Sequence, residues 1–171
     1  MSNIIIGTAG HIDHGKTALI RALNGFEGDS TNEEKQRGIT IDLSFSNLTR
    51  AERNIAFIDV PGHEKLIKNM IAGAFGFDYV MLVVSSKEGL MPQTIEHIEI
   101  LSLLGIKNLI LVITKKDLVD EKILKEQESK IVEFLNEFEF NIKFIKAVSI
   151  YDEKSIEDLK DSKIGGIEGA Y

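Results

Sequence analysis

Apolar residues follow two spacings along the chain, and together these predict alternating strands and helices. Continuous apolar runs, which are typical of strands covered on both faces, occur at Ile4–Ile6, Ile55–Ile58, Tyr79–Val84 and Leu109–Ile113. Alternating apolar and polar residues predict a half-exposed strand over Ile41–Phe45, and Ile142, Phe144 and Ile145 predict a last one. We therefore expect six strands.

Helical spacing fills the intervals between these strands. Apolar residues over 18–23 predict a first helix, and Pro92 suits the first position of another, with apolar residues following at spacing three. Between Glu121 and Phe138, one helical face is apolar and the other is rich in Lys and Glu, as for a solvated surface. Alternating strands and helices predict an α/β fold, with a mainly parallel sheet and helices on both faces. Only about nine residues separate the second strand from the third, which makes that pair antiparallel.

Composition limits the classes that remain. The chain has 171 residues, a formal net charge of −7 and no cysteine. The acidic net charge argues against a domain that holds nucleic acid mainly by neutralising its backbone phosphates. The absence of cysteine excludes disulfides and thiol chemistry. Without a signal peptide or a long apolar run, we expect a soluble, cytoplasmic protein. We expect one domain over 1–163, with 164–171 as a linker, a frayed end or an extension left by cloning.

The segment Gly10–Thr17, GHIDHGKT, matches the phosphate-binding pattern GxxxxGK[ST] between a predicted strand and a predicted helix. Glycines let backbone N–H groups surround phosphate oxygens, and the helix N-terminus adds partial positive charge. Lys16 is expected to reach the β- and γ-phosphates, and the Thr17 hydroxyl to bind Mg²⁺. The nucleotide-binding residues predicted in this segment are Asp13, His14, Gly15, Lys16, Thr17 and Ala18.

Asp13 is unusual in a pocket that binds anions. It either points outward and caps the loop, or faces the phosphates and holds a monovalent cation that cancels its charge. Both interpretations stay open.

Three further residues are candidates for the magnesium and γ-phosphate site. Asp59 ends the third strand, where a carboxylate can hold Mg²⁺ through water, although a simple turn residue is the alternative. Gly62 offers a backbone N–H to the γ-phosphate. Thr40 closes a long polar loop and could reach Mg²⁺ when the γ-phosphate is present, or be an ordinary residue at a strand start.

The segment Thr114–Asp117, TKKD, follows a buried strand and is a candidate for reading the base. A carboxylate at Asp117 can accept hydrogen bonds from guanine N1–H and N2–H₂, which adenine does not offer in that arrangement. The stem of Lys115 would cover the purine face. Ala147 and Val148 follow the last predicted strand, and the backbone N–H of Ala147 is expected near guanine O6.

Taken together, GHIDHGKT, RGITID, DVPGHEK, MPQTIEH and TKKD resemble the GTPase domain of translational elongation factors over about residues 3 to 160. Within this family, four features resemble the selenocysteine-specific branch more than elongation factor Tu. Thr114 replaces the usual Asn of NKxD, Glu64-Lys65 follows PGH, Asp42 follows RGITI, and the loop between Lys16 and Thr40 is short. The change at Thr114 leaves open whether one contact that supports the base loop is absent.

The resemblance implies a P-loop NTPase with a Ras-like G domain that binds GTP with Mg²⁺ and hydrolyses it on the ribosome. It implies that His63 orients the attacking water once ribosomal RNA repositions it, with Lys16 and Gly62 as the other catalytic groups. Ile12 and Ile39 resemble the pair that screens this histidine. The remaining histidines, His11, His14 and His97, are expected to be mostly structural.

The resemblance also implies partners. These are the ribosome, selenocysteyl-tRNA and a selenocysteine-insertion mRNA hairpin, the last bound through β-barrel and mRNA-binding domains that are absent from this chain. Two alternatives stay open: a general aminoacyl-tRNA carrier similar to elongation factor Tu, and a guanine-nucleotide-binding module without turnover.

Overall fold

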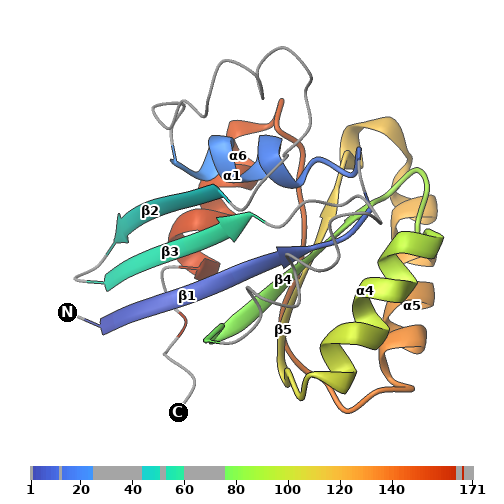
Figure 1. Cartoon of the computed structure of the whole chain (residues 1–171). Coiled ribbons are helices and arrows are strands. Elements are labelled where there is room, and N and C mark those ends of the chain that lie inside the picture. Colours follow the sequence, from blue (N-terminus) through green and yellow to red (C-terminus); the bar gives the residue numbers. More distant parts are fainter. Residues whose placement is uncertain are drawn as a thin grey trace.

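A computed structural model describes residues 2–11, 13–24, 44–50, 53–59, 76–164 and 167. Within this part of the chain, a six-stranded sheet forms the middle of the molecule, in the order β2-β3-β1-β4-β5-β6 (Figure 1). The strands are β1 (Ser2–Ala9), β2 (Ser44–Arg50), β3 (Arg53–Asp59), β4 (Tyr79–Ser85), β5 (Asn108–Thr114) and β6 (Asn141–Ala147). All neighbouring strands are parallel except β2 and β3. The predicted α/β fold with one antiparallel strand is confirmed.

The second strand differs from its prediction. The alternation placed it over Ile41–Phe45, whereas β2 runs from Ser44 to Arg50, and residues 41–43 lie outside the described part. Only residues 51 and 52 separate β2 from β3, instead of about nine, so the pair is a hairpin in which Arg50 stands opposite Arg53. The polar sequence of β2 gives little strand signal, because pairing with β3 rather than side-chain periodicity defines this strand.

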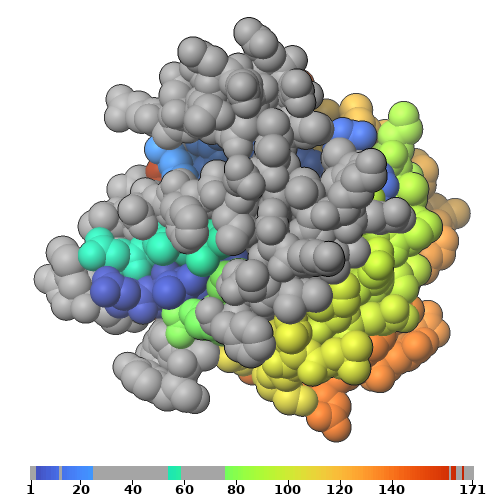
Figure 2. Space-filling model, viewed as in Figure 1, coloured from blue at the N-terminus to red at the C-terminus, as the bar shows by residue number. Residues whose placement is uncertain are grey.

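Helices cover both faces of the sheet. On one face lie α1 (Lys16–Asn24), α6 (Glu153–Glu157) and the π-helical turn η3 (Asp158–Lys163). On the other lie α4 (Pro92–Leu103) and α5 (Glu121–Leu135), whose outer surfaces form one side of the molecule (Figures 1 and 2). Within the described residues, no helix combines the length and apolar character that a membrane span requires.

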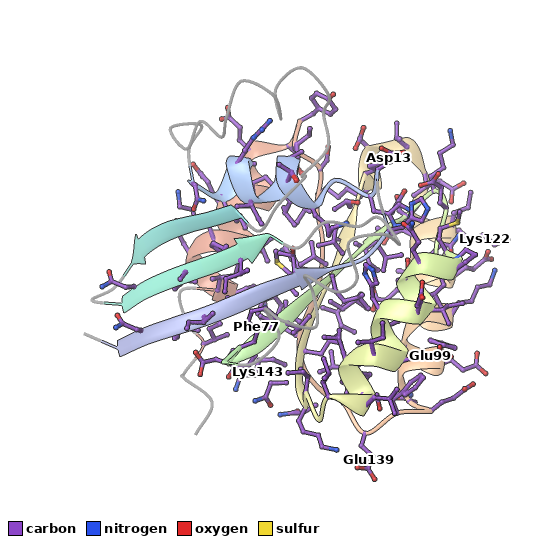
Figure 3. The ribbon with its side chains drawn as sticks, viewed as in Figure 1. Asp13, Phe77, Glu99, Lys122, Glu139 and Lys143 are labelled. Carbon is purple, nitrogen blue, oxygen red and sulfur yellow. The ribbon has the colours of Figure 1, made fainter. Side chains whose placement is uncertain are left out.

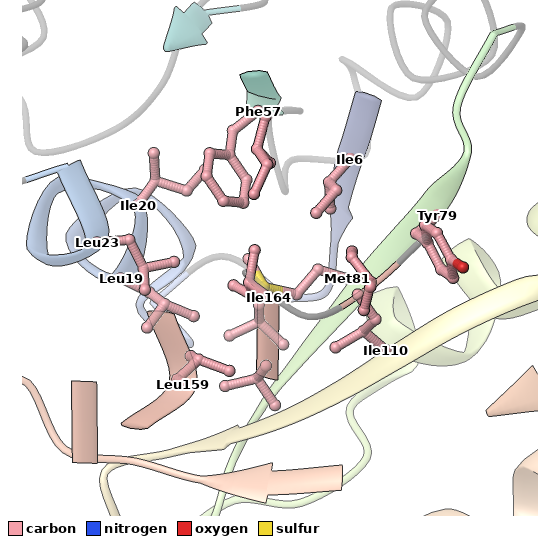
Figure 4. Packing of buried hydrophobic residues seen from close by; sticks show 14 of the residues in the cluster. Ile6, Leu19, Ile20, Leu23, Phe57, Tyr79, Met81, Ile110, Leu159 and Ile164 are labelled. Carbon is pink, nitrogen blue, oxygen red and sulfur yellow. The ribbon is translucent and has the colours of Figure 1, made fainter. Parts of the chain in front are cut away.

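Each helix packs on its face through apolar residues. Beneath α1, side chains of Ile6, Phe57 and Met81 from three strands meet Leu19 and Leu23, all of them fully buried (Figure 4). The second face joins β4 and β5 to buried residues of α4 and α5. Burial on both faces explains the continuous apolar runs of β4 and β5.

The two helices predicted to begin near Pro92 and Glu121 are present as α4 and α5. Helix α5 begins after Asp120, whose side chain accepts a 2.8 Å hydrogen bond from the Ile123 N–H, as an N-cap residue does. The helix ends at Leu135, so Phe138 lies in the following turn, where it still packs against the second face. The apolar spacing therefore identified the packing surface correctly while extending the helix too far.

The C-terminal segment contains structure that the pattern did not predict. Helix α6 and η3 follow β6, and Ile164 and Ile167 are 0% and 2% exposed in the core beneath α1. The packed part of the chain thus reaches Ile167, beyond the predicted boundary at residue 163. Residues 165–166 and 168–171 lie outside the described part.

Candidate nucleotide-binding site

The chain turns sharply between β1 and α1, beyond the carboxyl end of the central strand (Figure 3). Gly10, Asp13 and Gly15 have positive φ angles of 139°, 67° and 87°. These angles bend the chain tightly within six residues, and turns of this kind can direct backbone N–H groups toward a common centre and form a concave anion site. Asp13 itself is exposed, and its carbonyl faces the neighbouring loop described below.

The two glycines of this phosphate loop are required for different reasons. A Cβ on Gly10 would stand 2.2 Å from the carbonyl oxygen of Val83 in β4, so the close approach of two backbones excludes any side chain. A Cβ on Gly15 would meet no atom of the described residues within 4 Å. Gly15 is thus needed for its backbone angle, and the space beside it is open for a ligand.

Lys16 begins α1, and its side chain folds back over the loop. Its Nζ donates hydrogen bonds to the carbonyls of Gly10, at 2.9 Å, and His11, at 3.0 Å. The N–H of Leu19 makes a 2.8 Å bond to the Gly15 carbonyl, so the N–H groups of the turn before it point toward the loop. Thr17 and Ala18 lie in that turn and are half-buried. A cation and a helix N-terminus therefore converge on one loop, an arrangement suited to phosphate.

His14 supports the loop from inside the protein. Its side chain is fully buried, and Nδ1 accepts a 3.2 Å hydrogen bond from the Ser85 N–H at the end of β4. Burial lowers the pKa of His14 to about 4, despite the nearby Glu88 carboxylate, which raises it. The imidazole is therefore neutral near pH 7 and carries its proton on Nε2. That nitrogen lies 2.9 Å from Glu88 Oε2, with an alignment outside hydrogen-bond geometry.

The base loop follows β5 and forms the 3₁₀ turn η2 (Lys116–Leu118). Two side chains join it to the phosphate loop. Thr114 Oγ1 donates to the carbonyl of His14 at 2.7 Å, and Lys115 Nζ donates to the carbonyl of Asp13 at 2.7 Å. Thr114 thus supplies a contact between the two loops. Asp117 is exposed, so its carboxylate is accessible to a ligand.

The segment after β6 lies beside the base loop. Ala147, predicted just past the strand, is its last residue, and the buried Val148 uses its N–H for the Ile113 carbonyl. The Ser149 N–H donates to Ser155 Oγ. Among the described residues, no group accepts from the Ile150 N–H, which makes it the first amide beyond β6 available to a ligand. The sequence pattern did not single out Ile150, because it placed the strand end before Ala147.

The predicted metal residues are partly described. Thr17 lies in the first turn of α1, and Asp59 is the last residue of β3, the strand beside β1. No group of three or more His, Cys, Asp or Glu in the described part could hold a metal by itself. One hydroxyl and one carboxylate fit Mg²⁺, which keeps several waters and uses nucleotide phosphates as ligands. Five predicted site residues lie outside the described part: Ile12, Ile39, Thr40, Gly62 and His63.

Comparison with known proteins decides the family. The family model "Elongation factor Tu GTP binding domain" matches residues 1–164. The chain belongs to this family. As a member of the translational GTPases, which hydrolyse GTP, it shares the G-domain fold of its relatives.

Among individual relatives, the chain is similar to selenocysteine-specific elongation factors. The chain is 47% identical, over 92% of its length, to the selenocysteine-specific elongation factor of Desulfomicrobium baculatum. It also resembles the crystal structure of a bacterial selenocysteine-specific elongation factor, at 45% identity and a TM-score of 0.87 over 95% of the chain. The elongation factor SelB of Methanococcus maripaludis, in complex with the GTP analogue GppNHp, matches 98% of the chain at 31% identity and a TM-score of 0.81. The chain covers 25%, 28% and 35% of these proteins, respectively.

Proposed function

We propose that this domain binds and hydrolyses GTP within a factor that delivers selenocysteyl-tRNA to the ribosome. The observation that carries the proposal is the joining of the phosphate loop to the base loop by Thr114 and Lys115. The two hydrogen bonds fix the distance between a site for phosphate and a site for guanine. A single guanine nucleotide can then bridge both.

The phosphate end of the nucleotide occupies the concave loop Gly10–Thr17. Lys16 exchanges its hydrogen bonds to the loop carbonyls for the β- and γ-phosphates. Thr17, through its hydroxyl, and Asp59, through water, would hold Mg²⁺. Thr40 joins them when the γ-phosphate is present. The ion neutralises charge on the phosphates, which is a main requirement of phosphoryl transfer.

Guanine binds at the base loop. Asp117 accepts from N1–H and N2–H₂, the stem of Lys115 covers one ring face, and the Ile150 N–H takes the O6 contact first predicted for Ala147. Val148 supports this segment through its bond to β5.

Hydrolysis depends on His63, which orients water, with Gly62 donating its N–H to the γ-phosphate. Ile12 and Ile39 screen His63 until ribosomal RNA repositions it. Without ribosomes we expect slow turnover, on the order of 10⁻⁴ to 10⁻² s⁻¹.

Asp13 offers a place for a monovalent cation. It has a left-handed backbone conformation within the loop, and its side chain is exposed. If it binds K⁺ beside the phosphates, GTP turnover is faster in K⁺ than in a bulky organic cation. Equal rates and equal affinities exclude this role.

The proposal that this protein delivers tRNA rests on its relatives rather than on the site described here. This chain spans between a quarter and about a third of their length. The ribosome and selenocysteyl-tRNA are the proposed partners, with an mRNA hairpin bound by other domains, in the cytoplasm. A competition between selenocysteyl-tRNA and seryl-tRNA for a full-length factor in its GTP form separates this from a general carrier. Single-turnover hydrolysis with ribosomes, with His63→Ala as control, separates it from a module without turnover.

The decisive experiment on the chain itself is a titration with fluorescent GDP and fluorescent ADP. We expect GDP to bind and ADP not to bind. Loss of two charge-assisted hydrogen bonds in Asp117→Asn should weaken GDP binding about 100-fold, whereas Glu133→Gln on the exposed face of α5 should leave it unchanged. Equal affinity for the two nucleotides, or for Asp117→Asn and the wild type, contradicts the proposed base site.

A further inference from the structure

His97 ends the MPQTIEH segment, far along the chain from the phosphate motif, yet it contacts the phosphate loop. It comes from the buried side of α4, where its side chain is 1% exposed. Its Nδ1 accepts a 3.1 Å hydrogen bond from the N–H of Gly10, a residue 87 positions earlier in the chain. This contact ties α4 to the first residue of the loop.

Gly10 is where the conformation of the loop is set. Its φ of 139° and the nearby Val83 carbonyl leave its backbone one position against β4. The peptide before Gly10 donates to His97, and the peptide after it accepts from Lys16. The two residues therefore hold the peptides on either side of a single Cα, one from α4 and one from α1.

The contact also defines the state of the imidazole. Nδ1 accepts a hydrogen bond, so it carries no proton, and the neutral ring has its proton on Nε2. Burial, together with the charges of Lys16 and His11, lowers the pKa of His97 to about 4, which keeps the ring neutral. Within the described residues, Nε2 has no hydrogen-bond partner, although it is buried. An apolar residue would avoid this cost, so filling space does not explain a histidine here.

We propose that His97 is a positioning residue for nucleotide binding, which fixes the Gly10 peptide and thereby the phosphate loop from α4. The inference rests on the proposed binding of guanine nucleotides. Without the acceptor, the buried Gly10 N–H lacks a partner, and the loop has to shift to find one. The first residue of the phosphate loop then leaves its place, and the phosphate-binding residues that follow it shift with it.

Two substitutions at this position separate an acceptor from mere bulk. In His97→Leu the side chain fills space but accepts nothing, whereas in His97→Asn the amide oxygen can stand near the place of Nδ1. Ile98→Ala on the same helix is the matched control, because Ile98 is fully buried among the apolar residues of the second face. It destabilises the protein by forming a cavity and leaves the Gly10 contact in place.

The test is a titration of the wild type and these variants of the whole chain with fluorescent GDP, at a temperature where circular dichroism shows each to be folded. We expect His97→Leu to bind about tenfold more weakly, a change that corresponds to one lost hydrogen bond, and the other two to stay within about twofold of the wild type. The inference is overturned if His97→Leu binds like the wild type, or if His97→Asn or Ile98→Ala weakens binding as much as His97→Leu does. Failure of the wild type to bind GDP contradicts the proposed function instead.

A second measurement needs no variant. Nitrogen-15 NMR of wild-type histidines distinguishes the two neutral tautomers. The inference requires His97 with a bare Nδ1 and a proton on Nε2 near pH 7. A proton on Nδ1 overturns it even if His97→Leu does not fold.

Discussion

The phosphate loop and the base loop are joined at one edge of the sheet, yet they are held by different means. The phosphate loop takes its shape from glycine angles and from two buried imidazoles: His14 of the loop, which accepts from β4, and His97 of α4, which accepts from the loop. The base loop follows directly from a fully buried strand and is fixed by hydroxyl groups, since Ser86 Oγ donates to the Lys115 carbonyl at 2.8 Å. The first loop is set by its glycine angles and by imidazole contacts, and the second by the buried strand before it together with hydroxyl contacts. Substitutions that disturb the phosphate loop should therefore lower the free energy of unfolding more than those that disturb the base loop.

The largest effect of any single substitution should come from Gly10→Ala. The added Cβ would collide with the Val83 carbonyl at an unfavourable backbone angle, and neither partner can move without disturbing β1 or β4. We expect the free energy of unfolding to fall by about 4 kcal/mol in urea denaturation. Gly15→Ala, where only the angle is strained, should cost about 1 to 2 kcal/mol. Equal losses would mean that the contact with β4 does not define the loop.

Acid should damage the phosphate loop next. The pKa values of His14 and His97 are lowered to about 4 by burial, against an ordinary value of 6.5. Between these values the unfolded chain takes up protons that the folded chain does not. The stability from neutral burial is therefore complete above pH 6.5 and lost as the pH falls toward 4, by on the order of 3 kcal/mol for each imidazole.

Urea denaturation across that range measures this loss, and His97→Asn is the control because it removes one of the two titrations. Its stability should fall less steeply with acid than that of the wild type. Identical slopes would show that carboxylates alone cause the loss.

Loss of the hydrogen bonds that connect the two loops should lower stability less. Thr114→Val keeps the shape of the side chain but removes the donor to the buried His14 carbonyl. We expect a loss of about 1 to 2 kcal/mol in stability and several-fold weaker GDP binding, whereas Thr114→Ser should retain both. If valine and serine behave alike, the hydroxyl does not join the loops.

The smallest effect should come from Lys115→Met. This change keeps the stem expected over the purine and removes the ammonium group that donates to the Asp13 carbonyl in an exposed position. GDP binding should weaken no more than a few-fold, as solvent-exposed hydrogen bonds contribute little. Lys122→Met, on the exposed side of α5, is the control for the loss of one charge. An effect on GDP binding larger than that of Thr114→Val would show that Lys115, rather than Thr114, is the main connection between the two loops.

The same contrast explains what the sequence could predict. β4 and β5 were located to within about one residue, because a strand that is buried on both faces has a continuous apolar sequence. The phosphate and base motifs were found because their residues are adjacent in the chain. β2 and α6 were misplaced or missed, since a polar hairpin strand and a five-residue helix have no strong period.

The supporting contacts of the site were beyond such reasoning. Thr114 and His14 are 100 positions apart, and Gly10 and His97 are 87 apart. No local pattern connects them, because the sheet order brings them together. The sequence thus identified the groups proposed to touch the nucleotide, while the side chains that position the loop appeared only in three dimensions.

The place of β1 in the sheet has a consequence for how the chain acquires its structure. This first strand lies between β3 and β4, with Ile6 opposite Phe57 on one side and Tyr79 on the other. During synthesis it emerges long before either neighbour, and parallel pairing over such separations is slow. The amides of β1 should therefore become protected from hydrogen exchange late in refolding, in the same kinetic phase as those of β4.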